Sequence, residues 1–339
     1  MQASAEVSLA DKVEFLRQPE RYPDEPAAID VIETHFAWVF LSRVFAYKMK
    51  KPQKFRDLNL ISAQARRRSC ELEVSLNRRL AEATYIGVVR LSQLHSTMQL
   101  EGDGLALEWL VKMRRLPAQR NLIHAARDNR ASSSDLRALV TKLMTFYKQT
   151  PAAPWGAAAY LTTLRRQICD YGRQLSAPEF HIAAPAIDKL VTAQCHFIER
   201  RSDLLEARID QGRVVDAHGD LRPEHIFLLE DPQIIDCLEF KPELRLLDTA
   251  AEIVFLALEC ERLQQRALGE KILELYLDIG NDPARPLLLS FYRSMAALAR
   301  ALVSAWHLLD TDPESAEPWI RQANWYIDAA QASIDDASP

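Results

Sequence analysis

The sequence predicts an α+β protein of two lobes, a small β-rich N-terminal lobe and a larger, mainly helical C-terminal lobe. Two observations predict this division. Aromatic and β-branched runs separated by turn residues occur between Val31 and Met113, which is typical of antiparallel strands. Beyond Pro117, apolar residues recur at helical spacing almost to the end of the chain. The expected divisions are an N-terminal helix and lead-in at 1–28, an N-lobe at 29–116 and a C-lobe at 117–335.

The composition is that of an ordinary globular protein. Of 339 residues, 48% are apolar and 26% are charged, and the net charge of −5 gives no general attraction to nucleic acid or anionic membrane. The five cysteines include no C-x-x-C pair, which argues against metal clusters and a disulfide framework. The N-terminus lacks a leader pattern, and no uninterrupted apolar run approaches the ~20 residues of a membrane span. We therefore expect a soluble cytoplasmic protein that binds neither nucleic acid nor membrane.

The N-lobe is expected to hold five antiparallel strands and one further helix. A short helix at Leu9–Leu16 precedes a Pro-rich lead-in. The helix Arg66–Leu80 carries Leu72, Leu76 and Leu80 at four-residue spacing, which predicts a buried apolar face. The expected strands are 31–41, 44–51, 86–91, 97–100 and 105–113.

The C-lobe is expected to be built from seven helices without repeats. The helix from Leu246 carries Asp248 near its start, where a carboxylate can brace a neighbouring loop or interact with the helix dipole. The expected helices are 134–147, 155–172, 183–209, 246–268, 270–279, 284–308 and 316–334.

The most informative stretch is His218–Asp248. Two apolar runs, Ile226–Leu229 and Ile234–Ile235, flank the turn residues Glu230-Asp231-Pro232, which predicts a small hairpin. Asp220 lies before the first strand of this hairpin and Asp236 follows the second. A hairpin folds its ends together, so we expect the two carboxylates to face one site.

Phosphoryl transfer uses such a pair, one carboxylate to orient the acceptor hydroxyl and another to hold the metal ion. The protein-kinase loop reads H-R-D-x-x-x-x-N and is followed by the metal-binding Asp of D-F-G. The segment H-G-D-L-R-P-E-H at 218–225 keeps this register, with His225 in place of the Asn. Mg²⁺ prefers hard oxygen ligands, and an imidazole is a softer nitrogen ligand. His225 therefore leaves three alternatives: the protein uses a single metal ion, it prefers Mn²⁺, or it is a weak catalyst.

These residues resemble the aminoglycoside phosphotransferase-like branch of the kinase superfamily, whose loop usually begins His-Gly-Asp. Further phrases resemble one sub-branch of uncharacterised bacterial proteins, in which related members carry a fused P-loop ATP-binding domain. The similar phrases lie between about residues 9 and 330. They are E-T-H-F-A-W-V-F-L (33–41), Y-K-M-K-K-P (47–52), L-N-R-R-L (76–80), V-K-M-R-R-L-P (111–117), I-D-C-L-E-F (235–240) and A-W-H-L-L (305–309).

The resemblance implies a bilobal protein-kinase-like fold and a set of site residues. Lys48 matches the phosphate-contacting lysine of V-A-I-K, although Lys50 shares its strand face. Glu73 is the expected ion-pair partner of that lysine, with Glu71 as the alternative. A hinge that binds adenine through its backbone is expected near Glu108–Met113. The implied roles are Asp220 as catalytic base, Arg222 on the γ-phosphate, Asp236 and His225 on the metal, and Lys48, Glu73, Glu108 and Leu110 around the nucleotide.

The expected function is transfer of a phosphoryl group from ATP, or GTP, with Mg²⁺ or Mn²⁺, to a hydroxyl of a small molecule. No glycine-rich loop is present, so Thr34–Trp38 would have to cover the phosphates. That absence and His225 favour an alternative, a nucleotide-binding pseudokinase with a scaffold or regulatory role. A protein kinase or nucleotidyl transferase on the same scaffold is a third alternative. Only a short segment separates Asp236 from the next expected helix, which favours small substrates.

Overall fold

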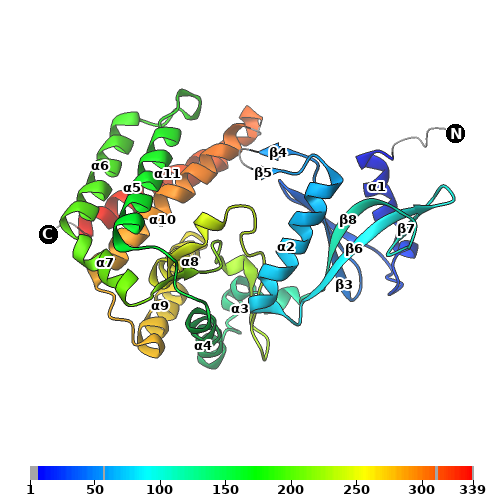
Figure 1. Ribbon diagram of the computed structural model, residues 1–339, viewed down its shortest axis with the longest axis horizontal. Coiled ribbons are helices and arrows are strands. Elements are labelled where there is room, and N and C mark those ends of the chain that lie inside the picture. Colours follow the sequence, from blue (N-terminus) through cyan, green and yellow to red (C-terminus); the bar gives the residue numbers. More distant parts are fainter. Residues whose placement is uncertain (1–6, 56–57, 310–311, 338–339) are drawn as a thin grey trace. The chain divides into compact units, whose positions relative to one another are not determined.

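The computed structural model describes residues 7–55, 58–309 and 312–337, and the first six residues of the expected lead-in lie outside these ranges. The described chain forms two compact units (Figure 1). The first contains the residues up to His124 together with His225–Pro242, and the second contains Ala125–Glu224 together with Glu243 onward. The hairpin, expected in the C-lobe, thus belongs to the first unit. It is tied there by hydrogen bonds such as Thr84 Oγ1 to Gln233 Oε1 at 2.8 Å and Leu228 N to Arg120 O at 2.8 Å.

The first unit is built on one antiparallel sheet of six strands. Five strands were expected, and the difference arises because the expected strand at 31–41 contains a tight turn. Thr34 N donates to Ala37 O at 2.8 Å, and Thr34 Oγ1 accepts from Ala37 N at 3.0 Å. The strands in spatial order are β1 (Asp30–Glu33), β2 (Ala37–Leu41), β3 (Phe45–Lys50), β8 (Leu105–Arg114), β6 (Tyr85–Leu94) and β7 (Thr97–Leu100). A separate pair is formed by β4 (Lys54–Phe55) and β5 (Leu58–Asn59).

Each face of the sheet has its own apolar cluster. On one face, Phe15 and Leu16 of α1 (Leu9–Leu16) are clustered with Tyr47 and Met49 of β3. On the other, α2 (Ala63–Ala81) packs across β6 and β8 (Figure 1). Because alternate residues of a strand point to opposite faces, Lys48 and Lys50 lie on the α2 side.

The buried face of α2 differs from the expected leucine stripe. Leu72 is exposed and Leu76 is half-buried, whereas Cys70 and Val74 face the sheet. The face turned inward also carries polar residues, which are tolerated there because they have ionic or hydrogen-bonding partners. The buried residues of α2 are Arg66, Cys70, Glu73, Val74, Asn77, Leu80 and Ala81.

The predicted hairpin is confirmed. Strand β10 (Ile226–Phe227) pairs antiparallel with β11 (Gln233–Ile234), with Ile226 opposite Ile234. Asp236 follows β11 after one residue. Between β8 and the hairpin the chain forms the turn η2 (Ala118–Arg120) and the short helix α3 (Leu122–Arg127).

The second unit is mainly helical, as expected. The predicted helix at 183–209 is interrupted at Arg201, whose ψ of 33° departs from helical geometry. The predicted helix at 246–268 begins instead with a strand, β12 (Leu246–Asp248), because these residues pair with β9 (Val214–Asp216). The helices are α4 (Ser133–Gln149), α5 (Ala157–Leu175), α6 (Ala184–Arg200), α7 (Ser202–Asp210), α8 (Thr249–Arg262), α9 (Arg266–Gly280), α10 (Pro286–Trp306) and α11 (Glu317–Asp336).

One segment, Pro286–Leu309, is long and apolar enough to cross a membrane by length and composition alone. Half of its most apolar window is buried inside the protein. The segment comprises α10 and the turn that follows it, and α10 packs against α5, α8 and α11. Its apolar residues therefore serve as a core of the second unit.

Candidate functional site

The first unit brings together three of the residues singled out in the sequence. Lys48 Nζ lies 3.0 Å from Glu73 Oε1 and 2.5 Å from Asp236 Oδ1. The lysine comes from β3, the glutamate from α2 and the aspartate from the end of the hairpin. Glu71, the alternative to Glu73, instead pairs with Arg67 on the outer face of α2 at 2.8 Å.

A second lysine enters the same cluster. Lys50 Nζ lies 2.6 Å from Glu73 Oε2 and 2.6 Å from Glu239 Oε1. Glu73, which is fully buried, is thus held between two ammonium groups. The sequence indicated that Lys50 shares the face of Lys48, but Glu239 was missed, although it lies in the phrase I-D-C-L-E-F.

Asp236 is held in a specific backbone conformation at the end of the hairpin. Its φ of +62° lies in the left-handed region, and its N–H donates to the Tyr85 hydroxyl at 3.2 Å. The next residue donates from its backbone to Asn77 Oδ1 at 2.8 Å. These bonds fix the direction of a carboxylate that remains 42% exposed, so it is accessible to a ligand.

The pKa values follow from this arrangement. Burial alone would raise the pKa of Asp236, but the attraction of Lys48 and His225 outweighs it and holds that pKa well below its usual range. Burial likewise opposes the charge on Lys48, yet Asp236 and Glu73 raise the pKa of Lys48 well above its ordinary value. Asp236 and Lys48 are therefore charged at neutral pH and stabilise one another.

His225 lies beside the predicted metal-binding carboxylate. Its Nε2 is 3.6 Å from Asp236 Oδ2, the oxygen that is not bonded to Lys48. The imidazole is largely buried, with 12% of the side chain exposed. The residue that replaces the usual Asn thus faces the same carboxylate that the Asn would be expected to face.

The stretch Glu108–Met113, where an adenine-binding hinge is predicted, lies inside β8. Leu110 is paired on both sides, with Val89 of β6 and Met49 of β3, so its peptide groups are used within the sheet. Glu108 is buried, bonded by Arg66 at 2.6 and 2.8 Å and paired with Lys12 at 3.1 Å. Strand β8 extends to Arg114, and Glu108 holds α1 and α2 to the sheet.

The second unit holds the loop with Asp220. The N–H groups of His218 and Gly219 donate to Glu252 Oε1 of α8 at 2.9 and 2.7 Å, and Tyr147 of α4 donates to Glu252 Oε2 at 2.6 Å. Gly219 has a φ of +82°, a conformation that favours glycine. Sequence reasoning missed Glu252, because a glutamate inside an apolar helix carries no local signal of what it binds.

Arg222 lies two residues after Asp220 in this loop. Its Nη2 is 3.5 Å from Glu224 Oε1, which also pairs with Arg262 at 3.1 Å. Burial would lower the pKa of Arg222, but Asp220 and Glu224 outweigh that and raise it. Asp220 and Arg222 therefore interact electrostatically within the loop.

Asp248 was expected either to brace a neighbouring loop or to interact with the helix dipole. The structure shows the second role, because Asp248 caps the start of α8. Its Oδ1 accepts from Ala250 N at 2.8 Å. It is also bonded by Arg208 through two nitrogens, at 2.6 and 2.8 Å, and Arg208 bonds Asp282 in the same way. The loop is braced by Glu252, one turn further along the helix.

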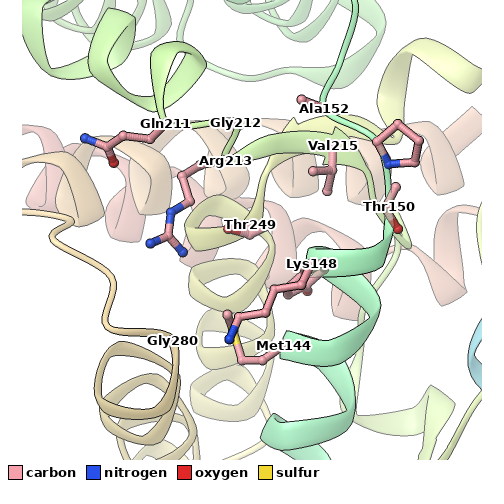
Figure 2. Close-up of a pocket in the computed structure, with 12 residues that line it drawn as sticks. Met144, Lys148, Thr150, Ala152, Gln211, Gly212, Arg213, Val215, Thr249 and Gly280 are labelled. Carbon is pink, nitrogen blue, oxygen red and sulfur yellow. The ribbon is translucent and has the colours of Figure 1, made fainter.

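A cavity of about 530 Å³ lies within the second unit (Figure 2). None of the predicted site residues lines it. Its two cations, Lys148 and Arg213, have structural roles: Lys148 lies in the last turn of α4, and Arg213 approaches Asn281 O and Asp282 beyond the end of α9, at 3.4 and 3.6 Å. Cations are favoured at such helix ends because of the helix dipole.

The donor set of the first unit fits a metal ion that arrives with phosphates. Within the described residues, no group of three or more His, Cys, Asp or Glu side chains could hold a metal. Mg²⁺ is usually held by one or two carboxylates and substrate phosphates rather than by a protein cage. Asp236, with its exposed carboxylate, meets that requirement, and His225 adds a nitrogen donor nearby.

Comparison with curated proteins finds relatives that are themselves uncharacterized. Proteins of Mycobacterium tuberculosis and Mycobacterium bovis are each 31% identical to this chain over 306 aligned residues, and the match covers 88% of this chain. The match covers 59% of each relative, so the chain spans about three fifths of the proteins it matches. No family model matches the chain.

Solved structures show the fold. The choline kinase of Cryptosporidium parvum superposes with a TM-score of 0.51 at 9% identity, over 97% of each chain. A choline/ethanolamine kinase family protein of Mesorhizobium loti gives 0.49 at 13% identity, over 95% of this chain and 98% of that one. An aminoglycoside phosphotransferase of Streptomyces rimosus with ADP and streptomycin gives 0.43 at 15% identity, over 85% and 97%. At such identities the similarity concerns the fold alone. The α+β class predicted from the sequence is confirmed, because this chain has the kinase-like fold of that choline kinase.

Proposed function

We propose that this protein is a nucleotide-dependent phosphotransferase that moves the γ-phosphoryl group of ATP, or GTP, to a hydroxyl of a small molecule. The observation that carries the proposal is Lys48 held between Glu73 and Asp236 on a kinase-like fold. Kinases use a lysine, its glutamate partner and a metal-binding aspartate in this combination to position the phosphates.

Each residue of the first unit has a distinct part in the proposal. Lys48 binds the α- and β-phosphates, and Glu73 fixes the direction of its ammonium group. Asp236 and His225 would hold Mg²⁺ or Mn²⁺, which supplies positive charge to the phosphoryl oxygens when bound. In this structure Lys48 bonds directly to Asp236. On binding, the nucleotide phosphates would take Lys48 and the metal ion would take Asp236, which separates the pair.

The loop of the second unit supplies the acceptor side. Asp220 would accept the proton of the attacking hydroxyl, and Arg222 would bind the γ-phosphate, for which a guanidinium is well suited. Glu252 holds the loop through two backbone N–H groups. This is a positioning role, and positioning and electrostatic stabilisation supply most of the rate enhancement in phosphoryl transfer.

The first test is a thermal-shift titration with ATP or GTP and Mg²⁺ or Mn²⁺. Ligand at about 100 times Kd stabilises the native state by about 2.7 kcal/mol, which we expect to raise Tm by about 5 °C. Lys48→Met should abolish most of this rise. A suitable control is Lys51→Met, because Lys51 pairs with Glu33 at 2.6 Å at the end of the same strand, outside the cluster.

If no nucleotide–metal pair shifts Tm at millimolar concentration, the nucleotide site does not exist. If Lys48→Met and Lys51→Met respond alike, Lys48 is not the phosphate-binding lysine. Where binding is found, a screen of hydroxyl-bearing metabolites for ADP release would identify the acceptor.

A nucleotide-binding pseudokinase is the second candidate. It is favoured by one observation, the imidazole of His225 at 3.6 Å from Asp236 in place of the usual amide. A pseudokinase would show the thermal shift without turnover on any acceptor and without slow hydrolysis of the nucleotide. If the wild-type protein hydrolyses the nucleotide detectably and Asp220→Asn does not, the protein is an enzyme rather than a pseudokinase.

A further inference from the structure

Two cysteine side chains meet between α5 and α6 of the second unit, which lie side by side in Figure 1. Cys169 Sγ on α5 and Cys195 Sγ on α6 are 4.0 Å apart. Cys169 is exposed and Cys195 is half-buried, whereas Cys70, Cys237 and Cys260 are buried. The two cysteines are 26 positions apart in the sequence, so they do not form a C-x-x-C motif.

The contact belongs to a regular antiparallel register between the helices. One turn before Cys169, Arg165 Nη1 bonds Glu199 Oε1 at 2.9 Å, one turn beyond Cys195. On the other side, a Cβ added to Gly172 would lie 2.3 Å from Val191 Cγ2, so the helices approach closely there. The ion pair and the close approach fix the helices on both sides of the two thiols.

We propose that Cys169 and Cys195 form a dithiol modification site that closes to an intramolecular disulfide on reaction with a small disulfide such as glutathione disulfide. Cys169 attacks the reagent, forming a mixed disulfide and releasing one glutathione thiolate. Cys195 then attacks the Cys169 sulfur and releases the second glutathione. The protein dithiol loses two electrons and two protons, and the reagent is reduced to two thiols.

Accessibility determines which sulfur reacts first. Cys169 is open to a reagent, while burial and the neighbouring Cys169 raise the pKa of Cys195 to about 11. A raised pKa makes the Cys195 thiolate scarce at neutral pH. Once Cys169 carries a mixed disulfide it can no longer bear a negative charge beside Cys195, and the second step is intramolecular.

The bond would fasten two helices that hold the second unit together. Helix α5 also packs against α7 and α10, and α6 packs against α11. A disulfide that closes a loop of this length restricts the unfolded chain more than the folded one. The two thiols are already in contact at 4.0 Å, and the closed form should be the more heat-stable one.

The full-length protein is incubated with glutathione disulfide near neutral pH, denatured and alkylated. We expect three alkylated cysteines instead of five, a mass before alkylation lower by about 2 Da, and a peptide map that joins Cys169 to Cys195. Tm should rise by roughly 5–10 °C, and dithiothreitol should reverse every change.

Two single variants separate the steps. Cys195→Ser should stop at a glutathione adduct on Cys169, heavier by about 305 Da, without the rise in Tm. Cys169→Ser should react little. A wild-type protein that keeps a stable adduct on Cys169, that keeps five alkylatable thiols while a reference dithiol is fully oxidised, or that loses heat stability on closing the bond would overturn the proposal.

Discussion

The protein contains two ion networks of similar composition and different accessibility. In the first unit, Lys48 and Lys50 share Glu73, and the network ends at Asp236, whose carboxylate is 42% exposed. In the second unit, Arg208 bonds Asp248 and Asp282 through paired contacts, and all three side chains are at most 3% exposed. Tyr276 and Tyr292 bond the same carboxylates, which completes the hydrogen bonding.

The difference shows how to separate a binding site from a structural ion cluster. A buried guanidinium that already makes four hydrogen bonds to two carboxylates has little capacity for a further partner. Removing it leaves charges that water cannot reach. Lysines are point charges on flexible stems, so their partners can be exchanged. The network of the first unit combines such lysines with an exposed carboxylate, and it is the one suited to a ligand.

The largest effect is expected from breaking the second network. Arg208→Met leaves Asp248 and Asp282 buried without their cation, which costs about 3–5 kcal/mol. Asp282 is especially affected, because burial would raise its pKa and the bonds from Arg208 lower it. Denaturant unfolding monitored by circular dichroism measures the loss.

Arg213→Met is the matched control for that variant. Arg213 is 3.6 Å from Asp282 and 23% exposed, so its loss should cost about 1 kcal/mol or less. Equal destabilisation by the two variants would show that the paired contacts of Arg208 have no special importance in the second unit.

The next effect concerns activity rather than stability. Asp220→Asn should lower turnover by about 10²–10⁴-fold while leaving nucleotide affinity nearly unchanged, because the base acts only on the acceptor. Asp236→Asn should instead weaken binding of the metal–nucleotide complex itself. The two are compared by isothermal titration and by ADP release, and identical binding behaviour would contradict this division of roles.

The sequence predicted the fold class, α1 and the hairpin because each depends on local pattern: apolar periodicity, turn residues and a strand texture. The prediction failed where a segment pairs with a strand that is distant in the sequence. Leu246–Asp248 reads as the start of a helix but pairs with β9. Pairing across long sequence distances leaves no mark on the segment itself.

The candidate site shows the same division. Lys48 and Asp236 were found because they match motif positions, and Glu73 because such a lysine is expected to have a glutamate partner. The structure brings the three into contact. Glu252 and Glu239 were missed, since each bonds a partner that nothing nearby in the sequence identifies. The leucine stripe of α2 misled for a related reason: ion pairs allow Glu73 to take an inward position that periodicity assigns to apolar residues.

A smaller effect should appear in the pH dependence of stability. The pKa values of Asp236 and Glu73 are lower in the folded chain than their ordinary values of 3.8 and 4.5. Both therefore stabilise the folded state fully above those ordinary values, and the contribution is lost as the pH falls through the lowered ones. The free energy of unfolding should be nearly flat from pH 7 to about 5 and decrease below about 4.

Asp236→Asn tests the origin of that decrease. Removing one carboxylate with a lowered pKa should make the dependence on acid shallower, by up to about one proton in the slope. A denaturant series at several pH values measures it. An unchanged slope would indicate that Lys48 does not hold Asp236 in solution, and that the buried carboxylates of the second unit determine acid stability instead.

The smallest effect is expected at His225, where the network of the first unit departs from the usual kinase pattern. An imidazole nitrogen beside a carboxylate suits borderline transition metals, so Mn²⁺ should support nucleotide binding several-fold better than Mg²⁺. His225→Asn restores an oxygen donor and should shift the preference toward Mg²⁺, which thermal-shift titrations with each metal would record. His225→Ala serves as the comparison, because it removes the nitrogen without adding a donor. If His225→Ala keeps the wild-type order of metals, the imidazole is not a ligand, and its position beside Asp236 serves to hold the carboxylate in place.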